Sequence, residues 1–149
     1  MTMRIEPVDE RTLHDWREVH NVIIPNAALS VEEVRERIGQ NHLTVAYVDD
    51  TLVGCATVRP PAGPDRTATV IVRVLAAHRR RGYGQRFYES ELARAYELGA
   101  GAIETVVLVT NVDGVRFAQS RAFVEVDRYF PEDGSAAFLT MRLDGGDRK

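Results

Sequence analysis

Hydrophobic and polar residues follow two repeating patterns along nearly all of this 149-residue chain. Alternation at every second position is typical of half-buried strands, and recurrence every three or four residues is typical of amphipathic helices. The patterns predict strands at 3–8, 42–48, 52–58, 67–76, 103–109, 123–130 and 136–143, and helices at 13–23, 30–39, 85–98 and 111–121. We therefore expect an α/β (α+β) fold in which helices cover a central sheet.

Local signals set several of the expected boundaries. Ser30 and Glu33 have the spacing of a capping box at the second helix, and Gly39 is its expected C-cap. The segment 60–65, rich in proline and glycine, is expected to be a loop. For the fourth helix, Asn111 is a candidate N-cap, with the acidic residue two positions later as the alternative.

The order of the central elements predicts part of the topology. A helix at 85–98 separates the strands at 67–76 and 103–109, which implies a right-handed crossover and parallel pairing of the two strands. We expect a single domain at 1–143, followed by a short, polar and disordered tail at 144–149.

The junction between the strand at 67–76 and its following helix carries the most informative chemistry. Three consecutive arginines, 79–81, precede Gly82 and Gly84. A helix N-terminus offers unpaired backbone N–H groups and the positive end of the helix dipole, which both favour an anion. Glycine allows a sharp turn and a close approach by a ligand, while arginine matches phosphate geometry. The sequence therefore indicates a phosphate site.

This junction differs from two well-known nucleotide-binding motifs. No Lys-Ser or Lys-Thr pair follows Gly84, as a Walker A loop requires, and Phe87 stands where the dinucleotide fingerprint has its third glycine. A solvated basic turn at a helix start is one alternative interpretation. An RNA-binding loop in which Tyr83 stacks on a base is another, but the net charge of −3 argues against it.

The pattern Arg79-x-x-Gly82-x-Gly84 after a hydrophobic strand resembles the pyrophosphate loop of the GCN5-related N-acetyltransferase (GNAT) family. In that family the loop amides hold the pyrophosphate of acetyl-CoA. The predicted order of elements is also similar to that of the whole family fold. The resemblance implies a single-domain acyl-CoA N-acyltransferase fold with a central, mixed, splayed sheet flanked by helices.

A second segment supports the resemblance. Residues 111–123 look like the family motif N-x-x-A-x-x-F-Y-x-K-x-G-F, which they match at Asn111, Phe117 and Phe123. The glycine before the last phenylalanine of the motif is Ala122 here.

The resemblance implies acetyl-CoA as the co-substrate, with no metal. Backbone groups at the end of the long strand would pair with the pantetheine amides, and the helix after residue 111 would lie beside the pantetheine arm. The implied cofactor-binding residues are Val74, Leu75, Ala76, Arg79, Arg80, Arg81, Gly82, Tyr83, Gly84, Gln85, Asn111 and Phe117.

The implied reaction is direct attack of a primary amine on the acetyl-CoA thioester. Two departures from the family pattern leave the catalytic residues unknown. Ala118 replaces the tyrosine that is the usual candidate acid for the leaving thiolate, and Arg73 stands on the strand where members often carry a glutamate base. By side-chain type, the weak candidates are Tyr129, His20 and Ser120.

The expected function is therefore N-acetyl transfer to a small-molecule or peptide amine. Because of Ala118, a catalytically weak or inactive acyl-CoA-binding sensor or partner module stays open as an alternative. We expect no nucleic-acid or membrane partner. The acceptor, the acyl-chain preference and the oligomeric state, including a homodimer, are left open.

Composition adds few constraints. The hydrophobic content of 44% and the charged content of 28% are ordinary for a globular domain with a full core. The single cysteine, Cys55, lies in an apolar run, which favours a buried structural thiol. No apolar leader-like segment or membrane-length run is evident, so we expect a cytoplasmic protein.

Overall fold

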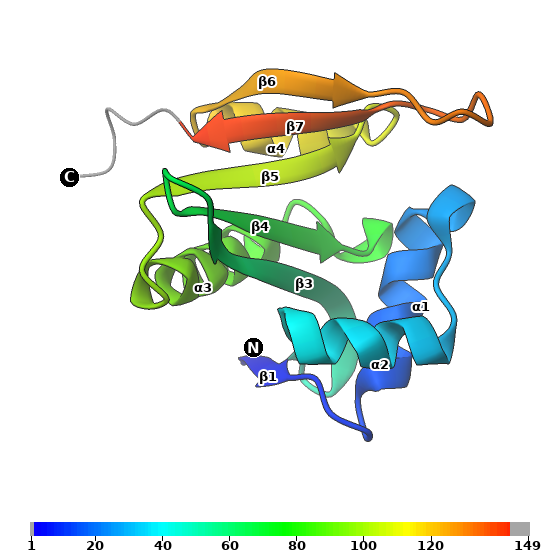
Figure 1. The fold of residues 1–149 in the computed structure, drawn as a ribbon. Helices are drawn as coiled ribbons and strands as arrows, with labels where there is room; N and C mark the ends of the chain where they lie inside the picture. The colour runs from blue at the N-terminus through cyan, green and yellow to red at the C-terminus, as the bar shows by residue number, and fades with distance from the viewer. Residues whose placement is uncertain (1, 144–149) are drawn as a thin grey trace.

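The computed structural model describes residues 2–143, which form one seven-stranded sheet with helices on both faces (Figure 1). The expected tail at 144–149 lies outside the described residues. The strands are β1 (Met3–Pro7), β2 (His42–Val48), β3 (Thr51–Ala62), β4 (Thr67–Val74), β5 (Ala102–Leu108), β6 (Phe123–Tyr129) and β7 (Phe138–Leu143). The helices are α1 (Leu13–Ile23), α2 (Val31–Gln40), α3 (Tyr83–Glu97) and α4 (Val112–Ser120), with short 3-10 helices η1 (Pro25–Ala27) and η2 (Ala76–His78).

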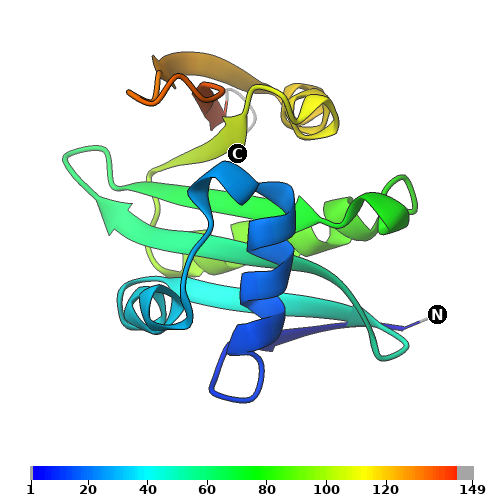
Figure 2. The same cartoon turned by 90° about the vertical axis from the view of Figure 1, so that its right-hand side faces the viewer.

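The sheet is mixed, with strand order β1-β2-β3-β4-β5-β7-β6. Its single parallel pair is β4 with β5, joined by the crossover helix α3, which confirms the expectation from sequence. This pair is short, because only residues 67–69 of β4 align with residues 102–104 of β5. Beyond these residues the two strands diverge (Figures 1 and 2). The sheet is therefore splayed, as the family resemblance implied.

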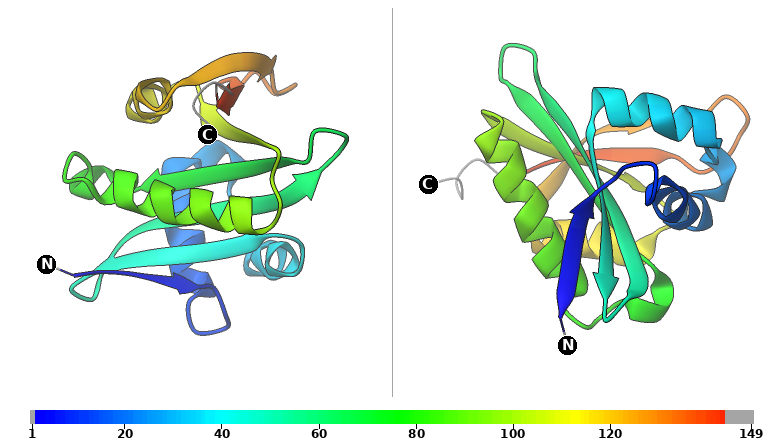
Figure 3. Two further views of the ribbon diagram at one scale, coloured as in Figure 1. Left: turned by 90° about the vertical axis from the view of Figure 1, so that its left-hand side faces the viewer. Right: turned by 90° about the horizontal axis from the view of Figure 1, so that it is seen from below.

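Helices cover the two faces of the first half of the sheet. Figures 2 and 3 show α1 and α2 on one face and α3 on the other. Trp16 of α1 packs with Val45 of β2 in the first cluster, and Phe87 of α3 packs with Val53 of β3 in the second. Tyr88 of α3 joins a third cluster with residues of α4, β5 and β7. Each large apolar side chain buried in this way stabilises the fold by about 1.5–3 kcal/mol.

Two helix starts are capped as the sequence indicates. At α2, the Ser30 hydroxyl accepts a hydrogen bond of 3.1 Å from the Glu33 N–H, and the Glu33 carboxylate accepts one of 2.8 Å from the Ser30 N–H. At α4, the Asn111 side-chain oxygen accepts a hydrogen bond of 3.1 Å from the Gly114 N–H. Asn111 is therefore the N-cap.

The expectation that Gly39 caps the C-terminus of α2 is wrong. The last residue of the helix is Gln40. The C-cap is Asn41, whose backbone is extended with φ −130° and ψ 164°. Because the chain runs straight into β2 at the next residue, it needs no left-handed cap, and the freedom of glycine is not used.

Two strand boundaries also differ from the expectation. β3 continues through Pro60 and Pro61 to Ala62, so the expected loop at 60–65 begins later. The prolines fall where the pairing of β3 with β4 is irregular, between Arg59 and Ala62, so their missing N–H groups cost no ladder hydrogen bond.

At its other end, β4 stops at Val74 rather than Ala76. The Leu75 N–H bonds to Val53 O at 2.9 Å, and the chain then turns into η2.

The residue that follows the C-cap of α4 has a left-handed backbone. Ala122 has φ 70°, at the position where the family motif has glycine. A side chain in this region costs about 1–2 kcal/mol. The sharp turn from α4 into β6 therefore explains why glycine suits this position.

Glu91 is a buried carboxyl group in the middle of α3. It is 2% exposed and accepts a hydrogen bond of 2.8 Å from the Thr44 hydroxyl on β2. Burial raises the pKa of Glu91 to about 7, and the hydrogen bond from Thr44 opposes this rise only in part. The folded chain therefore holds this proton more tightly than the unfolded chain does.

We predict that Glu91→Gln stabilises the fold at neutral and alkaline pH. With a folded pKa of about 7 against an ordinary value of 4.5, the stability that the carboxyl group contributes is complete below the ordinary value and is lost as pH rises through 7. Glutamine has no charge to bury, so the variant should gain roughly 2–3 kcal/mol above about pH 8 and almost nothing below about pH 4.5. Urea unfolding at several pH values measures the difference.

Glu89→Gln, at an exposed position on the same helix, is the matched control and should leave the pH dependence unchanged. Variant and wild type are compared at each pH, because buried His20, with a pKa lowered to about 4, affects both with the opposite sign. Parallel stability curves for Glu91→Gln and wild type would contradict the raised pKa.

Candidate functional site

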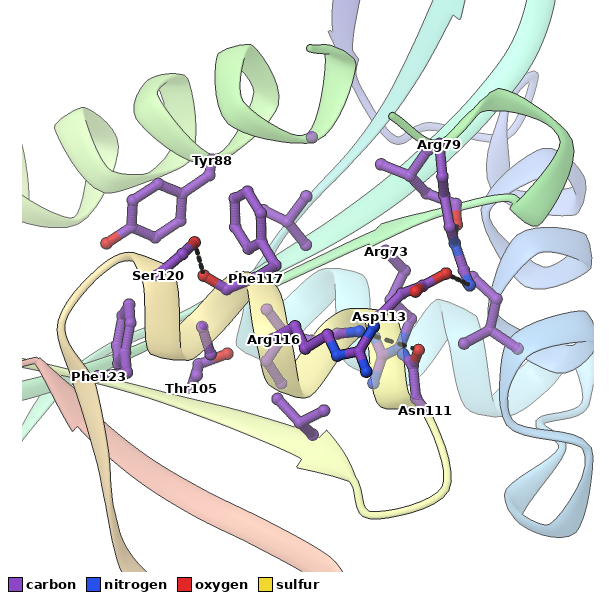
Figure 4. A pocket seen from close by; sticks show the side chains of 18 of the residues that line it. Arg73, Arg79, Tyr88, Thr105, Asn111, Asp113, Arg116, Phe117, Ser120 and Phe123 are labelled. Carbon is purple, nitrogen blue, oxygen red and sulfur yellow. Dashed lines mark hydrogen bonds and ion pairs between the residues drawn. The ribbon is translucent and has the colours of Figure 1, made fainter. Parts of the chain in front are cut away.

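A cavity of about 540 Å³ opens where β4 and β5 diverge (Figure 4). Its walls come from residues 70–74 of β4, residues 105–108 of β5, the start of α3, most of α4 and the end of α1. This volume is typical of small-molecule sites. Because β4 here pairs with β3 on one side and not with β5 on the other, one edge of its backbone faces the cavity.

The loop between η2 and α3 turns sharply at the cavity wall. Arg80 and Gly82 both have left-handed backbones, with φ 65° and 83°. The first backbone hydrogen bond of α3 runs from Arg86 N–H to Gly82 O at 3.2 Å. Gly84 precedes Arg86 in the chain and belongs to the first turn of the helix. The positive end of the helix dipole is therefore aimed at this loop.

Gly84 leaves the cavity open at a narrow place. A Cβ atom at this position would lie 3.6 Å from Cγ2 of Val74 and 3.9 Å from Cε1 of Phe117. These are ordinary contact distances, so alanine would fit, but a larger side chain would fill the space between β4 and α4. The walls at this point are apolar and close together, which suits a slender chain.

Two arginines of the loop are held by one carboxylate. Arg79 Nη1 lies 3.3 Å from Asp113 Oδ2, and Arg80 Nη2 lies 3.6 Å from Asp113 Oδ1. Arg79 also donates a hydrogen bond of 2.7 Å from Nε to Val74 O, at the open edge of β4. Phosphate oxygens are strong acceptors for guanidinium groups, so an anionic ligand would compete with Asp113 for both arginines.

Positive charge dominates this cavity. Among the lining residues within the described range, Asp113 is the one carboxylate, whereas Arg73, Arg79, Arg80 and Arg116 all contribute guanidinium groups. A site with this balance favours anionic ligands.

The structure brings most of the expected cofactor-binding residues to one cavity. Its lining includes Val74, Arg79, Arg80, Gly82, Gly84, Gln85, Asn111 and Phe117. The expected residues that are not part of this lining are Leu75, Ala76, Arg81 and Tyr83.

These four residues lie in different surroundings. Leu75 packs against the α1 cluster, Tyr83 is buried between α3 and the sheet, and Arg81 is exposed. Ala76 lines a second cavity of about 420 Å³, which shares Arg79 and Asp113 with the first. Because Ala76 belongs to η2, the extended backbone that faces the main cavity is that of residues 70–74.

The three catalytic candidates are not assembled together. His20 is buried, stacks on Trp16 with ring centroids 5.2 Å apart, and shares a hydrogen bond of 2.9 Å with Asn21. Burial, followed by the positive charge of Arg73, lowers the pKa of His20 to about 4, so its ring is neutral at neutral pH. His20 is not among the residues that line the cavity.

The other two candidates differ in position. Tyr129 lies at the exposed end of β6, outside the cavity lining, whereas Ser120 lines the cavity. The Ser120 hydroxyl donates a hydrogen bond of 2.7 Å to Phe117 O of its own helix. Catalytic roles for these residues stay predictions.

The cavity residues that sequence reasoning missed include two with a hydroxyl group, Tyr88 and Thr105. The Tyr88 ring packs edge-on against Phe117 and Phe123, with centroids 5.9 Å and 6.0 Å away (Figure 4). Burial raises the pKa of Tyr88 to about 12, so its hydroxyl keeps its proton. Its place four residues after Gly84, on the same face of α3, was the available signal.

The described part of the chain has neither a cluster of metal-ligating side chains nor a membrane-length apolar helix. Between residues 2 and 143, no three His, Cys, Asp or Glu side chains gather in a way that could hold a metal ion. In the same range, no helix combines the length and apolar character needed to cross a membrane.

Solved structures with the same fold include several acetyltransferases. Ard1 from Thermoplasma volcanium has a TM-score of 0.80 and 15% identity, covering 97% of this chain and 99% of that chain. The structure of yncA from Salmonella typhimurium with its cofactor acetyl-CoA has a TM-score of 0.76 and 16% identity, covering 97% and 94%. Arabidopsis thaliana Naa50, in complex with the bisubstrate analogue CoA-Ac-MVNAL, has a TM-score of 0.75 and 17% identity, covering 97% and 99%. At these identities the likeness shows the fold alone.

Sequence comparison shows the family. The chain has no significant match among curated proteins. The model of the acetyltransferase (GNAT) family, however, matches residues 9–123. This range runs from the turn before α1 to the start of β6. It contains α4 and the glycine loop, which is the segment around Gly82 and Gly84 at the start of α3. The family match covers well over half of the sequence, and the chain therefore belongs to the GNAT acetyltransferase family.

Proposed function

We propose that this chain transfers the acetyl group of acetyl-CoA to a primary amine of a small molecule or peptide. The observation that carries the proposal is one continuous cavity that joins the glycine loop at the start of α3 to the open edge of β4. The first feature suits a diphosphate, and the second suits an amide-containing arm.

The residues of the cavity fit the coenzyme in two parts. Backbone N–H groups around Gly82 and Gly84, with the guanidinium groups of Arg79 and Arg80, would hold the diphosphate. The backbone edge at residues 70–74 would pair with the amides of the pantetheine arm. The N–H group of one of these amides would replace the Arg79 side chain as the donor to Val74 O. Phe117 and the Val74 side chain would flank the arm.

Bond formation requires the amine nitrogen and the thioester carbon to meet in line. The amine lone pair forms the new amide bond, the carbon–sulfur bond breaks, and the amine proton leaves as CoA is released as its thiol. Holding the two reactants in this geometry supplies much of the rate. A backbone N–H near Val74 would polarise the thioester carbonyl.

Proton transfer relies little on charged side chains of the cavity. The one carboxylate in the described lining, Asp113, is paired with two arginines, so water is the proposed acceptor for the amine proton. The leaving thiolate, with a conjugate acid similar to cysteine at a pKa of about 8.5, can be protonated by water. Tyr88, which keeps its proton and shares both the cavity and a core cluster with Ala118, is the candidate donor from the protein.

Turnover tests the proposed reaction directly. We predict that the protein releases CoA thiol from acetyl-CoA in the presence of some members of a panel of primary amines, and that mass spectrometry finds the acetylated amine. Tight acetyl-CoA binding with no thiol release from any amine would instead favour the sensor or partner module that Ala118 left open.

We predict that Gly82→Val weakens acetyl-CoA binding by about tenfold or more. At φ 83°, valine is strained and the loop must change conformation, which redirects its backbone N–H groups. Calorimetric titration with acetyl-CoA measures the effect.

Gly63→Val is the matched control, because Gly63 has φ 78° and equally open surroundings but lies in the turn between β3 and β4. It should destabilise the fold similarly and leave acetyl-CoA affinity unchanged. Equal affinities for both variants and wild type would remove the loop from the site.

Asp113→Asn is expected to tighten acetyl-CoA binding by roughly 3–10-fold at low salt, because it frees two arginines for the phosphates. Arg80→Ala should have the opposite effect, a loss of similar size, and Arg79→Ala should act in the same direction. All these changes should shrink in high salt. Calorimetry at two ionic strengths measures them.

Asp50→Asn removes a carboxylate from a surface ion pair with Arg4 and serves as the control. Affinities for the Asp113 and arginine variants that match wild type at both salt concentrations would exclude contact of these arginines with phosphate.

A further inference from the structure

Arg73 lies in the cavity but on a different face of the sheet from the expected coenzyme-binding residues. It pairs with Cys55 across β3 and β4, and Cys55 belongs to the cluster beneath α1 and α2. Its neighbour Val74 points to the opposite face, where it approaches Gly84 and Phe117. Arg73 therefore reaches the cavity from the α1 side (Figure 4).

No carboxylate in the described part of the chain neutralises the charge of Arg73. In residues 2–143, Arg73 forms no ion pair with a carboxylate, and its polar contact is the Cys55 thiol. Burial raises the pKa of that thiol to about 12, so it carries no negative charge at neutral pH. Burial also lowers the pKa of Arg73 itself, and Arg59 and Arg37 lower it further. The charged groups that face Arg73 are thus positive.

The positive charge of Arg73 also acts on His20. Burial and then the charge of Arg73 keep His20, on α1, in its neutral form. The α1 side of the cavity is therefore a region of uncompensated positive charge.

Arg73 is half-buried, and among the described residues its surroundings offer no negative charge to balance the part of its charge that is removed from water. Removing a charge from water without a partner destabilises the fold, so buried charges are normally paired. A guanidinium group offers a planar fork that matches a carboxylate with two parallel hydrogen bonds. The partner that the fold does not provide is an anion.

The coenzyme phosphates do not fit as this anion. The proposed diphosphate site lies at the loop of Arg79 and Arg80, and the coenzyme arm follows the face of Val74, Gly84 and Phe117. Arg73 reaches the cavity from the opposite face, and Ile23 at the end of α1 and the following Ile24 line the same cavity. The anion at Arg73 therefore belongs to the second reactant.

We propose that Arg73 binds an anionic group of the acceptor, so that the chain acetylates small amines that carry a carboxylate close to the amine, as amino acids do. The proposal rests on the proposed acetyl transfer. Arg73 and Val74 are adjacent on β4 and both line one cavity, so an acceptor bound there can be small and carry its anionic group close to its amine. A long peptide, whose C-terminal carboxylate is far from its N-terminal amine, does not meet this condition.

Matched acceptor pairs test this assignment. CoA release at saturating acetyl-CoA is measured for the common amino acids and for their carboxamides, with aminomethylphosphonate and methylamine as a second anionic and neutral pair. For accepted amines, wild type should favour the carboxylate by about tenfold or more in kcat/KM. Preference for the phosphonate alone would identify a different anion at the same arginine.

Arg73→Gln should abolish this preference, mainly through KM, and leave the carboxamide within about twofold of wild type. Arg73→Lys should keep part of it, because the charge remains without the planar fork. Arg94→Gln, an exposed arginine on α3 outside the cavity lining, should keep all of it.

Two further readouts separate this role from others. The melting temperature of free Arg73→Gln should equal or exceed that of wild type, whereas a decrease would indicate a structural arginine and overturn the proposal. With CoA present, N-acetyl amino acids should stabilise wild type but not Arg73→Gln, and their amides should stabilise neither. This binding test needs no turnover.

Three other outcomes would overturn the proposed role of Arg73. Equal loss of kcat for carboxylate and carboxamide would place Arg73 at the reacting carbonyl and overturn the proposal. Turnover of amines with no preference for anions would overturn it and leave acetyl transfer standing. Absence of acetyl-CoA binding would overturn the proposed function as well.

Discussion

The divergence of β4 and β5 is the constraint on which the rest of the site depends. A strand with a paired neighbour on each side uses its backbone N–H and C=O groups in hydrogen bonds to both neighbours, and none is left for a ligand. Here β4 pairs with β5 over three residues only, so its remaining length is bonded on the β3 side alone. The hydrogen bond from Arg79 to Val74 O shows that this edge attracts donors.

The same divergence separates two regions of positive charge. On the side of α3 and α4, the loop arginines face Asp113, and their charge is partly balanced. On the side of α1, Arg73 has no such partner among residues 2–143 and lies close to a neutral thiol, a neutral imidazole and other arginines. One cavity thus contains two different electrostatic environments.

The packed core makes this arrangement possible. α3 is fixed to the sheet by Phe87 and Tyr88, and its first turn is therefore held in place beside the end of β4. α1 is anchored by Trp16, whose indole N–H donates a hydrogen bond of 3.0 Å to Ala56 O. Because helices and strands are rigid on this scale, they position the loop and the cavity walls more accurately than a flexible segment would.

The sequence by itself determined the order of the elements, the parallel crossover, the capping box at Ser30 and the glycine loop at 82–84. These features depend on local spacing, which hydrophobic periodicity and cap chemistry report directly. Tertiary structure alone decided where β4 separates from β5, that Tyr88 lines the cavity, and that Arg73 has no carboxylate partner within the part of the chain that the structure describes. Pairing, burial and charge compensation are set by residues that are distant in the chain, so no local pattern contains them.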